Sequence, residues 1–101
     1  MGVDAVMKKF HTGQIVLHQR FEYRGVIYAA DDYFCHSDEW YELMADSEPP
    51  KDQPWYHLLV DGSQQVTYVA ERNLSASADC AQIDHPQLGQ HFKLFDGRGY
   101  S

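Results

Sequence analysis

The chain contains few residue pairs whose types and spacing could support catalysis. Cys35 and His36 place a thiol beside an imidazole, the two groups that a cysteine nucleophile and its base require. Side chains of sequence neighbours point apart as a rule, whereas a catalytic pair needs hydrogen-bond contact and is normally built from distant segments. We therefore interpret Cys35-His36 as an ordinary loop pair. Cys35 and Cys80 are expected to be free thiols without a catalytic role.

Carboxylates and histidines also lack the spacing of a metal site or an acid–base site. Asp31-Asp32, followed by Glu39 and Glu42, does not fit a calcium-binding loop and is typical of solvated charge and helix capping. The histidines show neither H-x-x-x-H spacing nor a companion Cys-x-x-Cys pair. A phosphate-binding glycine loop and a nucleophile elbow are missing from the sequence as well. We expect a protein that is not an enzyme and that uses no cofactor or metal.

Cationic side chains are the candidates for contact with nucleic acid. The formal net charge is −7, and residues 31–52 hold eight carboxylates against Lys51 alone. The remainder of the chain is balanced, so one end of the molecule could be locally basic. We expect His18 on the outer face of its strand, beside Arg20. The predicted nucleic-acid-binding residues are Lys8, Lys9, His18, Arg20 and Arg24, with Lys51 or Arg72 as further cations.

A short helix over residues 37–46 is the candidate surface for a protein partner. Ser37 is placed to cap its N-terminus, and Asp38 and Glu39 lie in the first turn, where the helix dipole favours anions. An apolar face with i, i+3, i+4 spacing is expected to pack on the sheet; it comprises Trp40, Leu43 and Met44. The predicted protein-interaction residues are Glu39, Trp40, Tyr41 and Glu42.

Aromatic side chains leave two interpretations open. They could stack on bases, as in proteins that bind single strands, or they could pack in the core. Core packing is favoured for the two tryptophans. The aromatic residues concerned are Tyr23, Tyr28, Trp40, Trp55 and Tyr56.

The fold is organised around a strand over residues 55–60 that follows Pro54 and is apolar on both faces. His57 within it is expected to be a hydrogen-bonded core or semi-core residue. Further strands are predicted over residues 15–21, 26–30 and 65–70, then a helical turn over 71–74, a loop over 75–79 and a tail that packs back on the body. Short strands, tight turns and one helical excursion predict a mainly β protein, a small barrel of the SH3-like or OB type.

Length and composition indicate one domain, over residues 10–101, preceded by a flexible N-terminus over residues 1–9. An apolar run of roughly 20 residues, the length that crosses a membrane, is missing from the sequence. The N-terminus also lacks the pattern of a signal peptide. A cytoplasmic protein without membrane contact is therefore expected.

Four sequence blocks resemble the YccV-like hemimethylated-DNA-binding domain family, and most closely its small heat shock members of the HspQ type. The blocks are Phe10-x-x-Gly13-Gln14-x-Val16-x-His18, Tyr23-x-Gly25-Val26-Ile27, Gln53-Pro54-Trp55-Tyr56-His57-Leu58-Leu59-Val60 and Thr67-Tyr68-Val69-Ala70-Glu71-x-Asn73-Leu74. The tail residues His85-Pro86, Phe92 and Phe95 fit the same pattern. One departure is Ala30-Asp31-Asp32-Tyr33, where many relatives have Asp-Pro.

The resemblance implies an SH3-like, partly open barrel and two functional themes. One is binding to hemimethylated DNA. The other is heat-shock-linked proteolysis, in which the protein is an adaptor or specificity factor for the ATP-dependent protease Lon and affects turnover of the replication initiator DnaA. The residues alone favour protein–protein interaction over DNA binding, whereas the family favours DNA. An open strand edge would also permit a homo-oligomer. The sequence therefore indicates a binding module and leaves its partner open.

Overall fold

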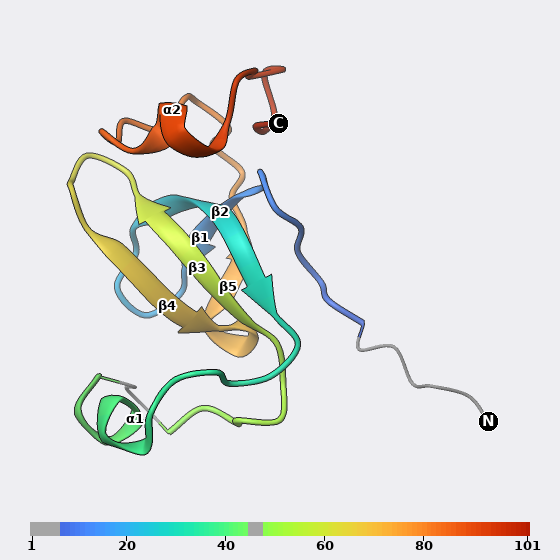
Figure 1. The fold of residues 1–101 in the computed structure, drawn as a ribbon. Helices are drawn as coiled ribbons and strands as arrows, with labels where there is room; N and C mark the ends of the chain where they lie inside the picture. Colours follow the sequence, from blue (N-terminus) through green and yellow to red (C-terminus); the bar gives the residue numbers. More distant parts are fainter. Residues whose placement is uncertain (1–6, 45–47) are drawn as a thin grey trace.

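A computed structural model describes residues 7–44 and 48–101 as one sheet with short helical segments (Figure 1). The elements, in chain order, are β1 (Ile15–His18), β2 (Arg24–Asp31), α1 (Asp38–Met44), β3 (Trp55–Val60), β4 (Val66–Ala70), the 3-10 turn η1 (Glu71–Asn73), β5 (Leu74–Ala76) and α2 (Leu88–His91). The mainly β class, with one helix inserted between strands, is thereby confirmed. None of the helices in the described ranges is long and apolar enough to span a bilayer.

The five strands form one antiparallel sheet in the order β4-β3-β2-β1-β5. β4 and β5 lie at opposite edges, although only η1 separates them in sequence. Four strand-to-strand spacings amount to about 19 Å, whereas the link from Ala70 to Leu74 reaches about 14 Å at most. The sheet must therefore curl until its edges approach each other. An irregularity between Ile27 and Ala29 helps β2 to bend. The result is the partly open barrel that the sequence predicts.

β3 is buried on both faces, as its apolar pattern predicts. Tyr56 and Leu58 point into one core cluster, and Leu59 points into another on the opposite face. Ile83 and Phe92, from the chain after β5, complete the second cluster, so the tail does pack back on the sheet. The remaining buried members are Val16, Ile27, Val69 and Leu74 in the first cluster and Ile15 and Val26 in the second.

Several strand boundaries differ from the prediction. β2 spans Arg24–Asp31 instead of residues 26–30. β1 ends at His18 instead of continuing to residue 21, because the backbone N–H groups of Arg20 and Phe21 both donate to the His18 Nδ1 atom and turn the chain. His18 is buried, so its expected place on an outer face is wrong. The predicted loop over 75–79 begins instead as β5, which pairs with β1. The early end of β1 comes from a side chain that bonds its own turn. The strand β5 comes from pairing with β1, a segment distant in sequence.

The helix α1 is capped as predicted but does not pack as predicted. The backbone N–H of Trp40 donates to the Ser37 hydroxyl at 3.1 Å, which confirms the cap. Leu43 and Met44 are 83% and 65% exposed, so the expectation of an apolar face against the sheet is wrong for them. Trp40 is half-buried and meets the Trp55 ring edge-on. The predicted helix positions 45 and 46 lie outside the described residues.

Candidate nucleic-acid interface and edge groove

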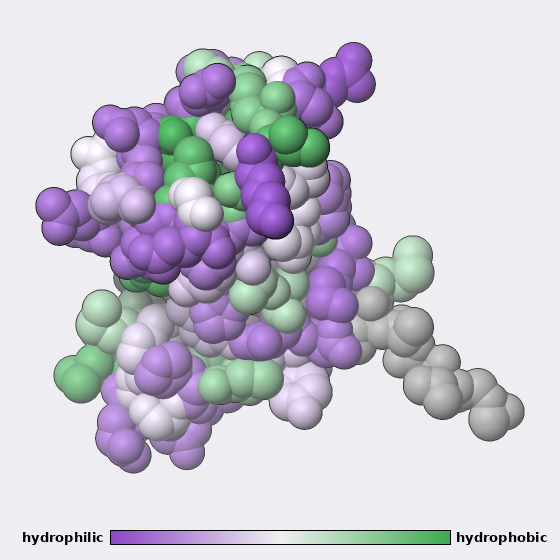
Figure 2. All heavy atoms as spheres, turned by 45° about the horizontal axis from the view of Figure 1, so that its top comes forward, coloured by the Kyte–Doolittle hydropathy of each residue, from purple (hydrophilic) through white to green (hydrophobic). Residues whose placement is uncertain are grey.

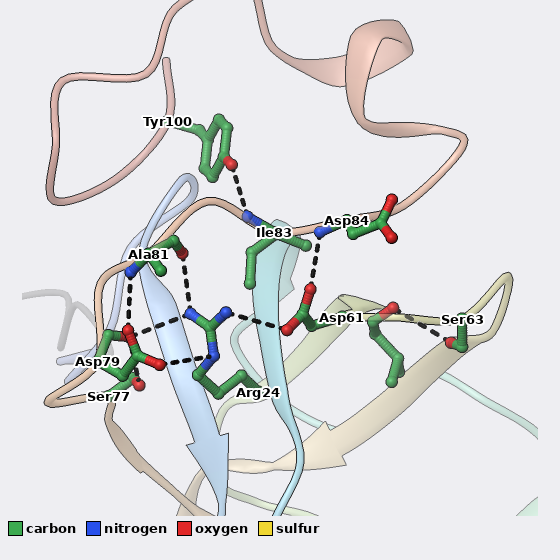
Figure 3. A network of polar contacts seen from close by, with 10 residues as sticks. Arg24, Asp61, Ser63, Ser77, Asp79, Ala81, Ile83, Asp84 and Tyr100 are labelled. Carbon is green, nitrogen blue, oxygen red and sulfur yellow. Dashed lines mark hydrogen bonds and ion pairs between the residues drawn. The ribbon is translucent and has the colours of Figure 1, made fainter.

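Arg24, one of the two arginines in the predicted DNA-binding set, is engaged in a network that ties the start of β2 to the chain after β5 (Figure 3). Its guanidinium contacts the Asp61 carboxylate at 2.9 Å and the Asp79 carboxylate at 3.6 Å. It also donates to the backbone carbonyls of Asp79 and Ala81. The Arg24 side chain is only 16% exposed. Its donors are thus directed at protein groups.

Lys8 and Arg24 lie at opposite ends of β2. Lys8 forms an ion pair with Asp32, which directly follows β2, whereas Arg24 begins that strand. Eight residues of β structure span about 23 Å. The structure therefore does not bring the predicted cations together on one face.

Three exposed cations do lie around η1, and we call them the cationic strip: Lys9, Arg20 and Arg72. The backbone N–H of Lys9 donates to the Glu71 carboxylate at 2.9 Å, which fixes Lys9 beside the first residue of η1. At the other end of η1, the backbone carbonyl of Asn73 accepts a hydrogen bond from the N–H of Gln19, the neighbour of Arg20. Arg72 lies between these two contacts.

A buried carboxylate supports the strip from beneath. Glu71 is 8% exposed and accepts a hydrogen bond from the Tyr56 hydroxyl at 2.6 Å. That hydroxyl also accepts a hydrogen bond from the backbone N–H of Phe10 at 3.4 Å. Burial, and then the bond to Glu71, raise the pKa of Tyr56, so the phenol remains a donor. Glu71 therefore anchors the N-terminal segment, and its charge is turned inward, away from a ligand on the strip.

His18 shapes the turn that carries Arg20. Its ring is stacked between Phe21 and Tyr23, with centroid distances of 4.8 and 5.0 Å. Its Nδ1 atom accepts two backbone hydrogen bonds from the turn. Phe21, next to Arg20, is 62% exposed. The histidine thus positions an exposed aromatic ring beside an exposed cation.

A groove of about 540 Å³ runs along β4, and we call it the edge groove. Every residue of β4 lines it. One wall comes from α1 and the loop before it, with His36, Trp40 and Met44. The other wall comes from the turn between β1 and β2, with His18, Phe21 and Tyr23. In Figure 1, β4 is the outermost strand on the left, with that light-blue turn beside it and α1 below.

A polar network braces the groove on the α1 side. Asp31 accepts hydrogen bonds from the Tyr68 hydroxyl at 2.7 Å and is 3.0 Å from the His57 Nε2 atom. The Tyr68 hydroxyl accepts a bond from the backbone N–H of Cys35. Burial, and then the bond to Asp31, raise the pKa of Tyr68. The network ties together β2, β3, β4 and the loop between β2 and α1. His57 is hydrogen-bonded as predicted, whereas the interpretation of Asp31 as solvated charge is wrong.

The predicted protein-interaction residues are distributed over both sides of α1. Trp40 lines the edge groove. Tyr41 instead donates its hydroxyl to the Pro49 carbonyl at 2.6 Å and lies under the Lys51 ammonium. Glu39 and Glu42 are exposed. Figure 2 shows hydrophobic spheres protruding at the lower left, the side on which α1 lies in Figure 1.

The aromatic residues that could stack on bases separate into two groups. Trp55 and Tyr56 are buried in the sheet, which confirms core packing for Trp55. Tyr23 and Trp40 are half-buried and reach the edge groove. Tyr28 stacks on His91 at a centroid distance of 4.5 Å. The sequence does not reveal the groove because its walls flank β2 and lie more than 20 residues before β4, and only the curl of the sheet brings them to β4.

Comparison with known proteins places these features in a family. The model of the family described as "Hemimethylated DNA-binding protein YccV like" matches residues 8–99. F-box only protein 21 of Homo sapiens and of Pongo abelii are each 35% identical to the chain over 94 residues. The Mus musculus protein is 34% identical over 94 residues. These alignments cover 90% of the chain, and the chain spans only 15% of the length of each relative.

Proposed function

The chain belongs to the YccV-like family of hemimethylated DNA-binding proteins, and we propose that it binds DNA through the cationic strip. The observation that carries this proposal is the gathering of Lys9, Arg20 and Arg72, all exposed, around one short turn. Phosphate contacts by such cations supply much of the affinity of a protein for DNA. The overall charge of −7 makes the position of this strip decisive, because the acidic segment over residues 31–52 would repel a phosphate backbone.

Preference for a hemimethylated site requires an apolar contact next to the cations. A methyl group in the major groove is read by such a contact beside hydrogen bonds to base edges. Phe21, exposed and adjacent to Arg20, is placed to make it. Arg24 is left out of this interface because its donors are held by Asp61 and Asp79. Lys8 has a smaller role, since Asp32 offsets its charge. His18 acts by positioning the turn.

The test is fluorescence anisotropy with matched unmethylated, hemimethylated and fully methylated duplexes over a salt series. The variant Arg20→Ala/Arg72→Ala should lower affinity about tenfold at low salt. It should also reduce the slope of log affinity against log salt by up to about 1.8, or 0.9 for each lost phosphate contact. Phe21→Ala should reduce the preference for the hemimethylated duplex more than it reduces overall affinity.

A matched control is available at the other end of the molecule. Lys93→Ala/Arg98→Ala removes the same two charges from the C-terminal segment, which lies opposite η1 in Figure 1. The DNA affinity of this control variant should stay within about twofold of the DNA affinity of the parent protein. Equal losses in both double variants would show that net charge, not the strip, governs binding. No binding to any duplex at low salt would contradict the proposal.

A role as an adaptor for Lon, acting in the cytoplasm on clients such as DnaA, is the second candidate. It is favoured by the exposed Leu43 and Met44 beside Glu39 and Glu42, an apolar and acidic surface on α1. Purified Lon should be retained by the immobilised protein and lost with Leu43→Ser/Met44→Ser. Retention of Lon by this variant at the parental level would exclude α1 as the contact surface.

A further inference from the structure

The outer edge of β4 carries backbone groups that no other strand uses. The register of β4 against β3 is fixed at both ends, by the bond from the Val60 N–H to the Gln65 carbonyl at 3.1 Å and by the bond from the Glu71 N–H to the Pro54 carbonyl at 3.0 Å. Residues of an antiparallel strand alternate between facing their partner and facing away. The backbone groups of Val66 and Tyr68 therefore point outward.

These outward groups have no hydrogen-bond partner within residues 7–44 and 48–101. They are the N–H and C=O groups of Val66 and Tyr68, together with the N–H of Ala70. An unpaired edge of this kind is a template for another strand. The opposite edge is formed by β5, which is only three residues long. β4 is thus the edge with more room for an added strand.

The edge groove encloses the space that such a strand would fill. Tyr68 lies on the same face as its partner His57, the face that α1 and Trp40 cover. Thr67 lies on the other face, where its hydroxyl is 2.9 Å from the Tyr23 hydroxyl. The two walls therefore stand on opposite faces of the sheet, with the β4 edge as the floor between them. Side chains of an added strand would alternate between these walls.

The walls differ in chemistry, and this defines the ligand. The turn wall presents Phe21, which is 62% exposed, with Tyr23 beside it. The α1 wall presents the Trp40 ring with His36 and Met44. It belongs to the acidic segment over residues 31–52, which holds eight carboxylates against Lys51 alone. An aromatic ring within an acidic segment favours lysine or arginine through cation–π and charge attraction.

We propose that the edge groove binds an extended segment of a protein partner as a sixth strand beside β4. The segment alternates apolar side chains, directed to the turn wall, with basic side chains, directed to the α1 wall. Backbone hydrogen bonds to Val66 and Tyr68 supply part of the affinity, and the walls supply selectivity. A second copy of this chain is a poorer fit because its net charge of −7 opposes close approach. The proposal does not rest on DNA binding, although Phe21 belongs to both sites.

The first experiment uses an eight-residue synthetic peptide that alternates lysine with leucine or phenylalanine, carries a fluorophore and is titrated with the full chain. Two further peptides carry N-methyl groups on one or the other set of alternate amides. Only one set of amides can face β4, so one methylated peptide should lose at least tenfold in affinity and the other should bind within about threefold of the parent peptide. Replacing lysine by glutamate should also cost at least tenfold. Equal binding of both methylated peptides would overturn the proposal.

Variants of the chain provide the complementary measurement. Val66→Pro removes an outward N–H without removing a bond to β3, so the fold should survive while peptide affinity falls at least fivefold. Val66→Thr is the matched control that keeps the N–H and should bind normally. If Val66→Pro does not fold, Met44→Ala, which alters only an exposed wall residue, should weaken the peptide about threefold. Undiminished binding by every folded groove variant contradicts the site.

Two outcomes would assign the groove to an occupant other than a partner peptide. Dimerisation of the free chain that the peptide reverses would assign the groove to a second copy and overturn the proposal. DNA that competes with the peptide as strongly in Phe21→Ala as in the parent chain would place nucleic acid in the groove itself and would also overturn it. Failure of the peptide assay leaves the duplex assay unaffected, because the peptide site needs Val66 whereas the DNA site needs Arg20 and Arg72.

Discussion

Arg24 and Arg20 are four residues apart in sequence, yet they occupy opposite kinds of environment. Arg24 is 16% exposed and directs its guanidinium at two carboxylates and two backbone carbonyls. Arg20 lies on an exposed turn beside η1, near Arg72. The first arginine holds the fold together, and the second belongs to the proposed DNA surface. A cation in a sequence thus indicates charge, whereas its exposure to solvent depends on which segments the fold places around it.

The largest effect that tests this difference is expected from Arg24→Ala. The change leaves Asp61, which is 27% exposed, without its cation and removes the hydrogen bonds to the segment after β5. We expect the free energy of unfolding to fall by about 2–3 kcal/mol. Urea denaturation followed by tryptophan fluorescence measures this loss. The DNA affinity of the folded fraction should be unchanged, and a tenfold loss would place Arg24 in the DNA interface.

Arg72→Glu is expected to show the reverse pattern. It places a negative charge in the middle of the cationic strip and should lower DNA affinity at least tenfold at low salt. Its effect on the free energy of unfolding should be smaller than that of Arg24→Ala. Parallel titrations with DNA and with urea compare the two variants directly. If Arg72→Glu destabilised the protein more than it weakened DNA binding, the strip would be a structural feature like the Arg24 network.

Two tyrosine–carboxylate pairs, one under the strip and one in the groove, predict a loss of stability in alkali. Burial and the bonds to Glu71 and Asp31 raise the pKa of Tyr56 and Tyr68, whereas the unfolded phenols titrate near 10. The contribution is present below about pH 10 and is lost as the pH rises toward the folded values. Each tyrosine should steepen the decline by up to about 1.4 kcal/mol per pH unit.

Urea unfolding between pH 9 and about 11 measures this decline. Tyr56→Phe and Tyr68→Phe should each remove part of it, and the double variant should remove most. A parental slope that persists in the double variant would mean that other groups cause the alkaline loss.

The smallest expected losses of stability come from replacing either of the two carboxylates that contact Arg24. Asp79 is 66% exposed and its ion pair is 3.6 Å long, so Asp79→Asn should cost no more than about 0.5 kcal/mol. Asp61→Asn should cost more, about 1–2 kcal/mol, because the Asp61 carboxylate also accepts the backbone N–H of Asp84 at 2.7 Å. The two midpoints of thermal unfolding rank the variants. Equal costs would show that the exposed pair is as important as the half-buried one.

The sequence alone determined the features that depend on neighbouring residues. The period of two along a strand placed apolar side chains on both faces of β3, and Ser37 was identified as the cap of α1. The sequence blocks around Trp55 and Tyr68 indicated the family and its curled sheet. Such features need only local backbone preferences and a period of two or 3.6 residues.

Only the tertiary structure decided which groups remain available to a ligand. The pairing of Arg24 with Asp61, the burial of His18 and the open edge of β4 each depend on segments that the sheet brings together from far apart in the chain. Hydrogen bonds and ion pairs act over a few ångströms in space, without regard to separation in sequence. For that reason the sequence could name the cations, while the curl of the sheet selected the ones that face solvent.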